Sequence, residues 1–286
     1  MRNDRLVWGQ RTYIMGILNL TPDSFSGDAI LQEKDPVAFA VKRACQFVKD
    51  GADIIDIGAE SSRPGSEPIT IAEELDRITP VIKAITQEKI PALISIDTYK
   101  SEVARTCLEL GADWINDIWG LLKDEALGKV VADSNVPVVL MHNRSRTHAV
   151  QKDSLVGSSY TAGDYQDFMQ DLLRDLDQLA QNALSTGILP ENIILDPGIG
   201  FGKTVAQNLQ IIRYLDQVKA LGYPVLIGPS RKSFIGNVLD LPVNDRIEGT
   251  AASIALGIEK GADIIRVHDV KYMARIAAMA DAIMRV

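Results

Sequence analysis

The sequence lacks several features that mark particular classes of protein. Only two cysteines occur among its 286 residues, Cys45 and Cys107, and no CxxC or Cys–His spacing is present. The sequence therefore predicts neither a disulfide framework nor a zinc site. No apolar run is long enough to span a bilayer, and the first residues contain no apolar signal core. We expect a cytoplasmic protein with no membrane partner.

An excess of positive charge is also missing. The chain has 38 acidic and 30 basic residues, which give a formal net charge of -8. Because a surface of this sign repels phosphate backbones, we expect no nucleic-acid partner. Hydrophobic residues make up 46% of the chain and charged residues 24%. This composition is typical of globular proteins and excludes a disordered or collagen-like chain.

A short motif is present in three copies. The triplet Gly-Ala-Asp begins at Gly51, Gly111 and Gly261, and β-branched or aromatic residues follow it each time. A helical pattern precedes every copy. The pattern predicts a glycine just past a helix end, where a positive φ costs little. It also predicts that a parallel strand, buried on both faces, comes next.

Strand patterns alternate with helical patterns along the chain. Besides the three triplets, the expected strands are residues 14–18, 93–97, 138–141, 193–196 and 225–228. The expected helices are residues 37–49, 71–88, 100–110, 124–134, 165–186, 205–221 and 245–260, with a last one from residue 271. Eight such alternations predict an α/β fold, namely a closed (β/α)₈ TIM barrel that forms one domain over residues 1–286. A doubly wound open sheet is the alternative, but it usually carries a GxGxxG after its first strand, which is absent here.

Polar residues stand at the carboxyl end of every expected strand. A lone Asp or Asn there often caps the next helix, as we expect for Asp117 and Asp269. In a barrel all these strand ends meet at one face, so the pattern as a whole predicts a polar site. The residues are Asn19, Asp56, Glu60, Ser62, Arg63, Asp97, Asn116, Asp117, His142, Asn143, Asp196, Arg231, Lys232, Ser233, Arg266 and His268.

One part of this set suits a planar heterocycle. Asp97, Asn116 and Asp196 combine two carboxylates with an amide. A carboxylate accepts two parallel N–H bonds from an amidine-like edge, and an amide both donates and accepts. A ring with adjacent N–H donors would satisfy these three side chains.

Another part suits phosphate oxygens. The cationic donors are Arg63, Lys232, Arg266 and His268. Arg266 and His268 are two residues apart on one expected strand, so both face the same side. Lys232 could instead form a Schiff base, as an aldolase lysine does, but the neighbouring arginines favour a donor role.

A glycine-rich stretch at residues 198–204, GIGFGKT, comes close to a P-loop. The P-loop has four residues between its first glycine and its Gly-Lys pair. Here only three residues separate Gly198 from Gly202, so we do not expect a nucleoside triphosphatase. We expect these glycines to let the backbone approach a ligand closely.

Ordered motifs along nearly the whole chain resemble those of the dihydropteroate synthase family. MGILNLTPDSFS stands at residues 15–26 and GAESSRPGS at residues 58–66, followed by SIDTYK, INDIWG, LMHNR, DPGIGFGK, GPSRKSFIG and RVHDV. The family joins 6-hydroxymethyl-7,8-dihydropterin pyrophosphate to p-aminobenzoate, releasing pyrophosphate and 7,8-dihydropteroate. The resemblance therefore implies a transferase of folate biosynthesis, a sulfonamide target that forms a homodimer.

The resemblance also implies roles for single residues. The pterin would contact Asp97, Asn116, Asp196 and Lys232. The pyrophosphate would contact Ser62, Arg63, Arg266 and His268, with its Mg²⁺ held in part by Asn19. The p-aminobenzoate would contact Phe25, Ser62, Pro64, Phe201, Lys232 and Ser233. The catalytic set would be Asp97, Asp196, Lys232 and Arg63.

The sequence departs from the family pattern in two loops, and two other functions stay open. Gly27 and Asp28 reverse the usual order of the first loop, while Ala59 and Ser62 replace a glycine and a threonine in the second. The altered first loop would suit a non-catalytic pterin-binding paralogue. A corrinoid-linked methyltransferase domain also binds a pterin in a barrel, although its folate carries no pyrophosphate. Release of pyrophosphate distinguishes the synthase from both.

Overall fold

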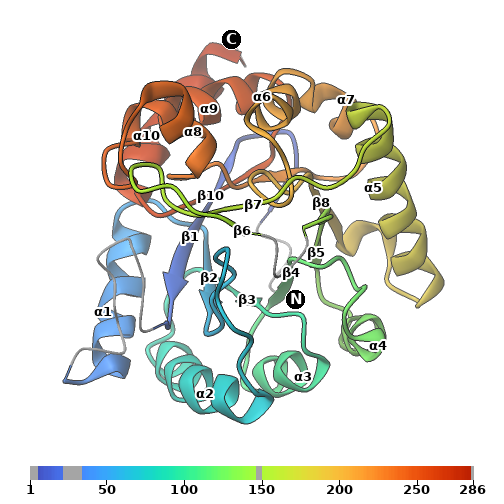
Figure 1. Ribbon diagram of the computed structural model, residues 1–286. Coiled ribbons are helices and arrows are strands. Elements are labelled where there is room, and N and C mark those ends of the chain that lie inside the picture. The colour runs from blue at the N-terminus through green and yellow to red at the C-terminus, as the bar shows by residue number, and fades with distance from the viewer. Residues whose placement is uncertain (1–5, 22–33, 146–149, 285–286) are drawn as a thin grey trace.

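The computed structural model describes residues 6–21, 34–145 and 150–284. Within these residues, eight parallel strands follow the order β8-β5-β4-β3-β2-β1-β10-β9. A further parallel bridge pairs Leu195 with Val225, next to β9, and so joins the two ends of that order. The sheet is therefore a barrel (Figure 1), as predicted. Its strands are β1 (Tyr13–Asn19), β2 (Ile54–Gly58), β3 (Leu93–Asp97), β4 (Trp114–Asp117), β5 (Val138–Met141), β8 (Ile193–Asp196), β9 (Leu226–Ile227) and β10 (Ile264–Val267).

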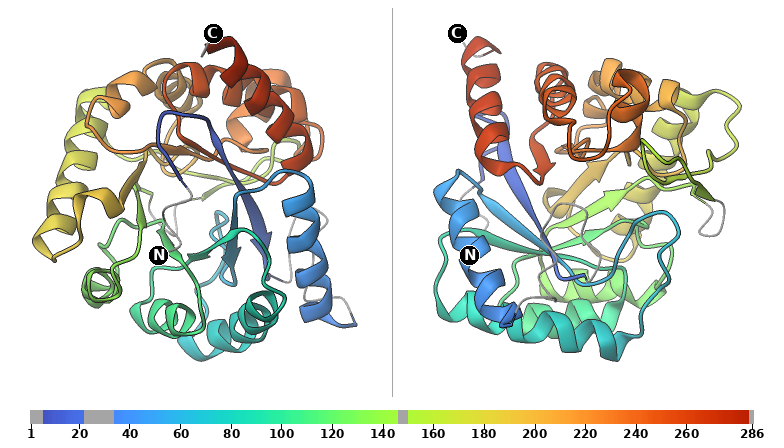
Figure 2. Two further views of the ribbon diagram at one scale, coloured as in Figure 1. Left: turned by 180° about the vertical axis from the view of Figure 1, so that it is seen from behind. Right: turned by 60° about the vertical axis from the view of Figure 1, so that its left-hand side comes forward.

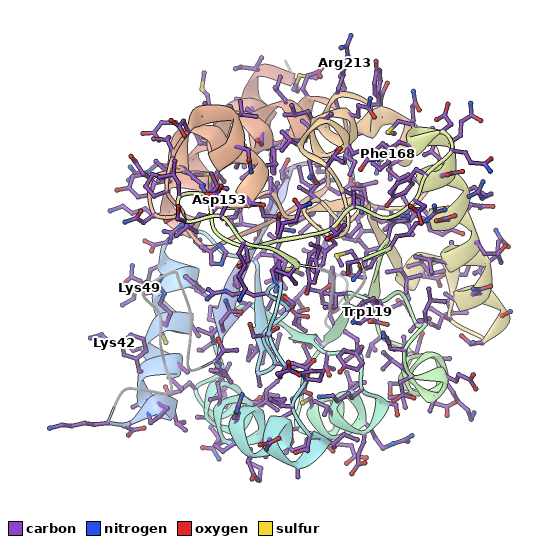
Figure 3. The ribbon with its side chains drawn as sticks, viewed as in Figure 1. Lys42, Lys49, Trp119, Asp153, Phe168 and Arg213 are labelled. Carbon is purple, nitrogen blue, oxygen red and sulfur yellow. The ribbon has the colours of Figure 1, made fainter. Side chains whose placement is uncertain are left out.

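Helices surround the barrel (Figure 2), and charged side chains such as Lys42, Lys49 and Arg213 point outward (Figure 3). The helices are α1 (Pro36–Lys49), α2 (Ile71–Gln87), α3 (Ser101–Glu109), α4 (Glu125–Ser134), α5 (Phe168–Ser185), α6 (Val205–Arg213), α7 (Leu215–Lys219), α8 (Ser233–Leu239), α9 (Ile247–Glu259) and α10 (Val270–Met284). A short 3₁₀ helix (Pro190–Asn192) precedes β8. Among the described residues, no helix combines the length and the apolar character needed to cross a bilayer.

Two helices differ from the prediction. The expected helix at 205–221 is divided into α6 and α7, because Tyr214 leaves the helical conformation with φ -115° and ψ 26°. The seven-residue helix α8 was not expected, and it follows the short strand β9. The remaining helices lie within a few residues of their predicted bounds.

The glycines of the three repeated triplets have the predicted conformation. Gly51, Gly111 and Gly261 have φ of 105°, 103° and 98°. After α1, the N–H of Gly51 donates to the carbonyl of Val48 at 3.0 Å, and that of Ala52 donates to the carbonyl of Phe47 at 2.9 Å. This is the Schellman pattern that ends a helix.

The aspartates of the triplets align neighbouring strands. The carboxylate of Asp53 accepts the N–H of Ile14 at 2.9 Å. In the same way Asp113 accepts the N–H of Ile94 at 2.9 Å, and Asp263 accepts that of Val225 at 2.8 Å. Each aspartate also donates its own N–H to the carbonyl of the same partner. The triplet is thus a unit that ends a helix and sets the register of the next strand pair.

The interior of the barrel is apolar at one end and polar at the other. Alternate residues of the strands point inward, and those near the amino ends form one buried cluster, which Leu6 and Trp8 cover. Its members are Tyr13, Met15, Ile54, Leu93, Trp114, Val139, Ile194, Leu226 and Ile264. Two residues further along β2, β3 and β4, the same inward positions hold Asp56, Ser95 and Asn116. The polar residues therefore lie at the carboxyl ends of the strands, as predicted.

A pair of two-residue strands lies between β5 and α5, where the sequence predicted neither a strand nor a helix. The strands β6 (Val150–Gln151) and β7 (Ser159–Tyr160) pair antiparallel. They cross the carboxyl end of the barrel in Figure 1, and Figure 2 places them at the same end as the segment after β2. The pair of β6 and β7 therefore lies over the predicted site.

Candidate active site

The strand register places three predicted site residues in one row, with Gly58 between the first two. Asn19 of β1 pairs with Gly58, Gly58 with Asp97, and Asp97 with Asn116 of β4. A Cβ atom at Gly58 would lie 3.3 Å from the Cβ of Asp97. Because glycine has no side chain, β2 places none between Asn19 and Asp97 at this level of the barrel.

A buried aspartate that the sequence analysis gave no role connects these residues. The Asp56 carboxylate accepts from Ser95 Oγ at 2.6 Å, Asn116 Nδ2 at 3.0 Å and Arg266 Nε at 2.6 Å. The Arg266 Nη2 atom donates to Asp97 at 2.6 Å. Asp56 and Ser95 both have zero exposure. Asp56 was in the predicted polar set without an assigned role, whereas Ser95 was missed. Ser95 lies two residues before Asp97 on β3, and that inward-facing spacing is the signal that could have identified it.

Burial disfavours the ionised form of two carboxyl groups that were predicted to contact the pterin. It raises the pKa of Asp97, an effect that the positive charge of Arg266 partly offsets. It also raises the pKa of Asp196, against the attraction of Lys232 and a 2.7 Å hydrogen bond from the N–H of Gly198. A ligand that brings N–H donors would stabilise the ionised form of both carboxylates.

Lys232 joins the predicted pterin and p-aminobenzoate residues. Burial lowers the pKa of Lys232 to about 8, although the negative charge of Asp196 opposes the shift. The Nζ atom donates to the carbonyl of Ile199 and lies 4.5 Å from the centre of the Phe201 ring. With that pKa the amine is mostly protonated at neutral pH. A lowered pKa is also what activates a Schiff-base lysine, so the donor role rests on the hydrogen bond from Nζ to the carbonyl of Ile199.

Burial opposes a positive charge on His268, so its predicted role as a cationic donor is not supported. Burial lowers its pKa to about 3. The cations that add to this effect are Arg231, Arg266, Arg63 and Lys232. The Nδ1 atom lies 3.1 Å from the hydroxyl of Ser230. Four cations near one buried histidine form a region that can attract an anion, although Arg231 and Arg266 also pair with carboxylates.

Other predicted residues have structural partners. Asp117 accepts the N–H groups of Trp119 at 2.8 Å and Leu121 at 2.6 Å, so it stabilises a turn. The carboxylate of Asp269, which directly precedes α10, forms a two-pronged ion pair with Arg231 at 2.8 and 2.6 Å. Ser233 begins α8. Phe25 lies outside the described residues.

Two glycines of the turn after β8 pack closely against protein backbone. A Cβ atom at Gly198 would lie 2.0 Å from the carbonyl oxygen of His142. One at Gly202 would lie 2.6 Å from the backbone nitrogen of Ser145. These contacts alone require glycine at both positions, and the close approach of the backbone to a ligand stays a prediction. Thr204 ends the turn and caps α6, since its hydroxyl accepts the N–H of Gln207 at 3.2 Å.

Lys203 of the same turn was missed as a structural residue. Its Nζ atom donates to the carbonyls of Gly198, Phe201 and His142 at 2.9, 3.0 and 3.3 Å. Lys203 is buried, and burial lowers its pKa to about 7. Three carbonyl acceptors for one buried amine fix the backbone that carries Phe201.

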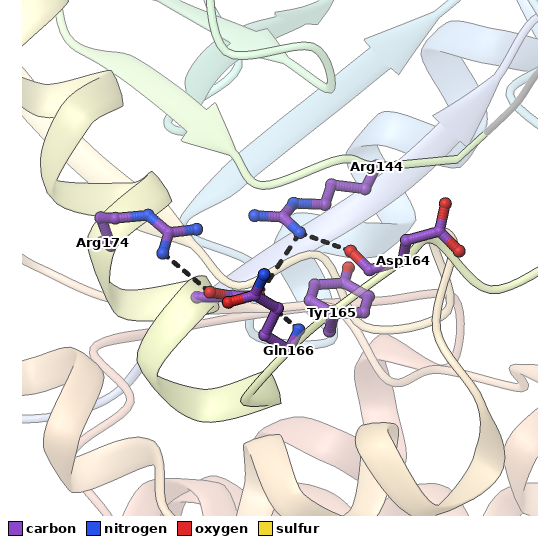
Figure 4. Close-up of a pocket in the computed structure, with 6 residues that line it drawn as sticks. Arg144, Asp164, Tyr165, Gln166 and Arg174 are labelled. Carbon is purple, nitrogen blue, oxygen red and sulfur yellow. Dashed lines mark hydrogen bonds and ion pairs between the residues drawn. The ribbon is translucent and has the colours of Figure 1, made fainter.

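A pocket of about 380 Å³ lies at the start of α5 (Figure 4). Arg144, Asp164, Tyr165, Gln166, Asp171 and Arg174 line it. Arg144 pairs with Asp175 at 2.6 Å, and Arg174 pairs with Asp171 at 2.8 Å. The lining contains two arginines and two aspartates, so its charges balance and it has no excess positive charge.

No group of three or more His, Cys, Asp or Glu side chains among the described residues is arranged to hold a metal ion. Asn19 is half-buried at the end of β1, where it pairs with Gly58, and Gly58 in turn pairs with Asp97. Its amide oxygen is a hard ligand of the kind Mg²⁺ prefers. One such oxygen fits a metal ion that is held mainly by a phosphorylated ligand.

Comparison with known proteins identifies similar chains. A family model described as pterin binding enzyme matches residues 15–268. A dihydropteroate synthase of Clostridium beijerinckii is 50% identical over 279 residues, covering 97% of this chain and 96% of that protein.

Solved structures show the same likeness. The dihydropteroate synthase of Clostridium difficile, crystallised in the presence of pteroic acid, has a TM-score of 0.88 and 43% identity, covering 98% of this chain and 100% of that one. The dihydropteroate synthase of Xanthomonas albilineans with 4-aminobenzoic acid has a TM-score of 0.86 and 35% identity, covering 96% of this chain and 94% of that one.

Proposed function

The chain belongs to the family of pterin binding enzymes, and we propose that it transfers the methylene of 6-hydroxymethyl-7,8-dihydropterin pyrophosphate to the amine of p-aminobenzoate. The products are 7,8-dihydropteroate and pyrophosphate, so the enzyme is a dihydropteroate synthase of folate biosynthesis. One observation carries the proposal. Buried carboxylates with raised pKa values, Asp97 and Asp196, lie at the same barrel end as the cations around His268.

The buried carboxylates suit the pterin. Asp97, Asn116, Asp196 and Lys232 would contact its ring, with Asp56 and Ser95 holding Asn116 and Arg266 in place. A pterin edge brings N–H donors to carboxylates that burial otherwise disfavours as anions. The match of donors to acceptors supports a pterin over an anionic or purely apolar ring.

The positive region suits the pyrophosphate. Arg63, Ser62, Arg266 and His268 would surround it. The guanidinium of Arg266 is paired with Asp56 and Asp97, so these carboxylates offset part of the positive charge that it offers to pyrophosphate. Asn19 would supply one ligand to Mg²⁺, which would neutralise charge on the leaving pyrophosphate. Arg63 adds positive charge to the same group, which makes it a better leaving group.

The reaction needs no protein nucleophile. The bond between the methylene carbon and the pyrophosphate oxygen breaks, and the electron pair leaves with pyrophosphate. Asp97 and Asp196 stabilise the positive charge that develops on the dihydropterin. The amine nitrogen of p-aminobenzoate bonds to the methylene and loses one proton. A large secondary deuterium isotope effect at the methylene is expected for this order, and its absence would favour direct displacement.

The second substrate would enter beside Phe201 and Lys232, which are in contact. Phe25, Ser62, Pro64 and Ser233 complete the proposed p-aminobenzoate site. We place the reaction in the cytoplasm, since both cysteines are free thiols and suit a reducing compartment. We also propose a homodimer, for which a groove on α6, α8 and α9 offers the apolar surface.

Product analysis tests this function. The purified enzyme is incubated with Mg²⁺, the pterin pyrophosphate and ¹⁵N-labelled p-aminobenzoate. Mass spectrometry should find dihydropteroate that carries the label. An unlabelled pterin product, or none, would contradict the proposal.

A further inference from the structure

We propose that Tyr160 is a positioning residue for the p-aminobenzoate site, holding the segment after β2 against the turn after β8. This inference rests on the proposed function, because that function is what assigns Ser62, Pro64 and Phe201 to one substrate. No sequence pattern singled out Tyr160. Its contacts are made across the end of the barrel.

The hydroxyl of Tyr160 reaches the segment after β2. It donates to the carbonyl of Ser62 at 3.0 Å, across 98 positions of sequence. Burial raises the pKa of Tyr160 to about 12, so the hydroxyl keeps its proton and remains a donor at neutral pH. The backbone at Ser62, two residues before Pro64, is therefore held from across the barrel.

The two ends of the segment after β2 are held by a residue of α2 and by the residue just before α3. Lys100 donates to the carbonyl of Ile69 at 2.7 Å, and Arg77 donates to that of Ala59 at 3.1 Å. Inside the segment, the Ser66 hydroxyl donates to the carbonyl of Arg63 at 2.7 Å. These contacts shape the segment but do not connect it to the turn after β8. Tyr160 supplies such a connection.

The ring of Tyr160 makes the second contact. It stacks on Phe201 with ring centres 5.8 Å apart and planes inclined by 26°. The Lys232 amine lies 4.5 Å from the centre of the same Phe201 ring. Stacked aromatic pairs prefer definite geometries, so the ring of Tyr160 restricts the orientation of Phe201.

The segment that carries Tyr160 is itself anchored. Tyr160 lies on β7, which pairs with β6. The N–H of Gly163 donates to the carbonyl of Gly202 at 2.8 Å. The buried Arg246 donates through Nη2 to the carbonyl of Val156 at 2.9 Å. A tyrosine held in this way can set the spacing between Ser62 and Phe201 without touching substrate.

Two substitutions separate the contacts. Tyr160→Phe keeps the ring and removes the hydroxyl, whereas Tyr160→Leu removes both contacts. Tyr165→Phe is the matched control, because among the described residues the buried Tyr165 hydroxyl has no hydrogen-bond partner. Each purified enzyme is assayed for kcat and for the KM of both substrates. The Kd of p-aminobenzoate is also measured with Mg²⁺, pyrophosphate and a pterin present.

We expect the Tyr160 variants to lose affinity for p-aminobenzoate but not for the pterin pyrophosphate. Tyr160→Phe should raise the KM and Kd for p-aminobenzoate roughly two- to tenfold, the range for one hydrogen bond. Tyr160→Leu should raise them roughly ten- to a hundredfold, since the stacking is lost as well. The KM for the pterin pyrophosphate should stay within about twofold of the parent, as should all values for Tyr165→Phe. The phenylalanine variant thus partly restores what the leucine variant loses.

Two results would overturn the inference: parent-like p-aminobenzoate affinity in both Tyr160 variants, or an equal loss for both substrates. A Phe201→Leu variant keeps this separate from the proposed function. If the parent makes no dihydropteroate, the function fails. If the parent is active but Phe201→Leu binds p-aminobenzoate normally, the assignment of the site fails. If Phe201→Leu loses affinity and Tyr160→Leu does not, only the role of Tyr160 fails.

Discussion

At the scale of single residues, the buried aspartates at the barrel end have different tasks. Asp56 has protein donors around it, from Ser95, Asn116 and Arg266, and it organises its neighbours. Burial raises the pKa of both Asp97 and Asp196. We interpret Asp56 as the support, and Asp97 and Asp196 as the groups that bind the pterin and stabilise its cation.

Replacing Asp196 with Asn should weaken pterin binding. The change places an amide donor opposite a ring N–H, and an unpaired buried donor costs about 1–3 kcal/mol. Calorimetry should therefore show a loss of roughly ten- to a hundredfold in pterin affinity. Asp133→Asn, on the exposed side of α4, is the control and should bind normally. An unchanged affinity in Asp196→Asn would remove this residue from the site.

Replacing Arg266 with Gln should move the acid limb of the pH–rate profile to higher pH. The positive charge of Arg266 lowers the pKa of Asp97, against the larger effect of burial. Without it, Asp97 takes up a proton at a higher pH, and the ionised form that stabilises the cation is lost sooner on acidification. The profile of kcat/KM against pH measures the shift, with Arg213→Gln on the outer surface as the control. A limb that stays in place would show that Asp97 does not control activity.

At the scale of elements, the repeated triplet explains why so much of the barrel could be predicted. Glycine at a helix end and strand residues after it are local signals, and strand–helix alternation is periodic. The pair β6 and β7 has two residues in each strand, too few for any period to show. The break at Tyr214 contains neither glycine nor proline, so the sequence gives no stop signal there. These elements depend on tertiary packing.

Removing the aspartate of one triplet should destabilise the fold without changing the chemistry. Asp263 is buried and accepts from the N–H of Val225 at 2.8 Å and from Lys219 at 2.6 Å. Asp263→Ala leaves that N–H unpaired, so the free energy of unfolding should fall by about 1–3 kcal/mol. Urea denaturation measures the fall, and Asp133→Ala should lose almost nothing. Equal effects in the two variants would show that the triplet aspartate has no structural role.

Residues of the site could be predicted where they stand at the ends of strands that the sequence pattern identifies. Asp97, Asn116, Asp196 and Lys232 follow recognisable strands. Their partners do not follow from local sequence, since Arg266 and Asp56 are 210 positions apart. The contact of Tyr160 with Ser62 uses a backbone carbonyl, which every residue has. Such contacts are determined by the closing of the barrel and leave no local signal.

At the scale of the whole molecule, the apolar cluster and the candidate site lie at opposite ends of the barrel. Its amino end is filled by large apolar side chains such as Trp114 and Met15, and its carboxyl end by the polar set around Asp56. A groove of about 400 Å³ on the outer surface lies between α6, α8 and α9. There Leu209, Val238 and Leu256 are 44%, 54% and 58% exposed. This is the surface that we propose for the homodimer.

Charge in this groove should break the dimer. Leu256→Glu places a carboxylate in apolar surface that a partner would cover, and burying it unpaired is unfavourable. Sedimentation equilibrium should find the parent as a dimer and this variant as a monomer. Met279→Glu, on the exposed side of α10, should remain a dimer. A monomeric parent, or a dimeric Leu256→Glu enzyme, would contradict the assignment of this surface.

Pyrophosphate release tests the central claim most directly. The enzyme with Mg²⁺ and the pterin pyrophosphate is assayed for released pyrophosphate with and without p-aminobenzoate. The account predicts sustained release that depends on p-aminobenzoate and matches dihydropteroate formed, one for one. A non-catalytic pterin binder or a methyltransferase would release none. If no pyrophosphate is released, or if its release is the same without p-aminobenzoate, this barrel does not carry out the proposed transfer.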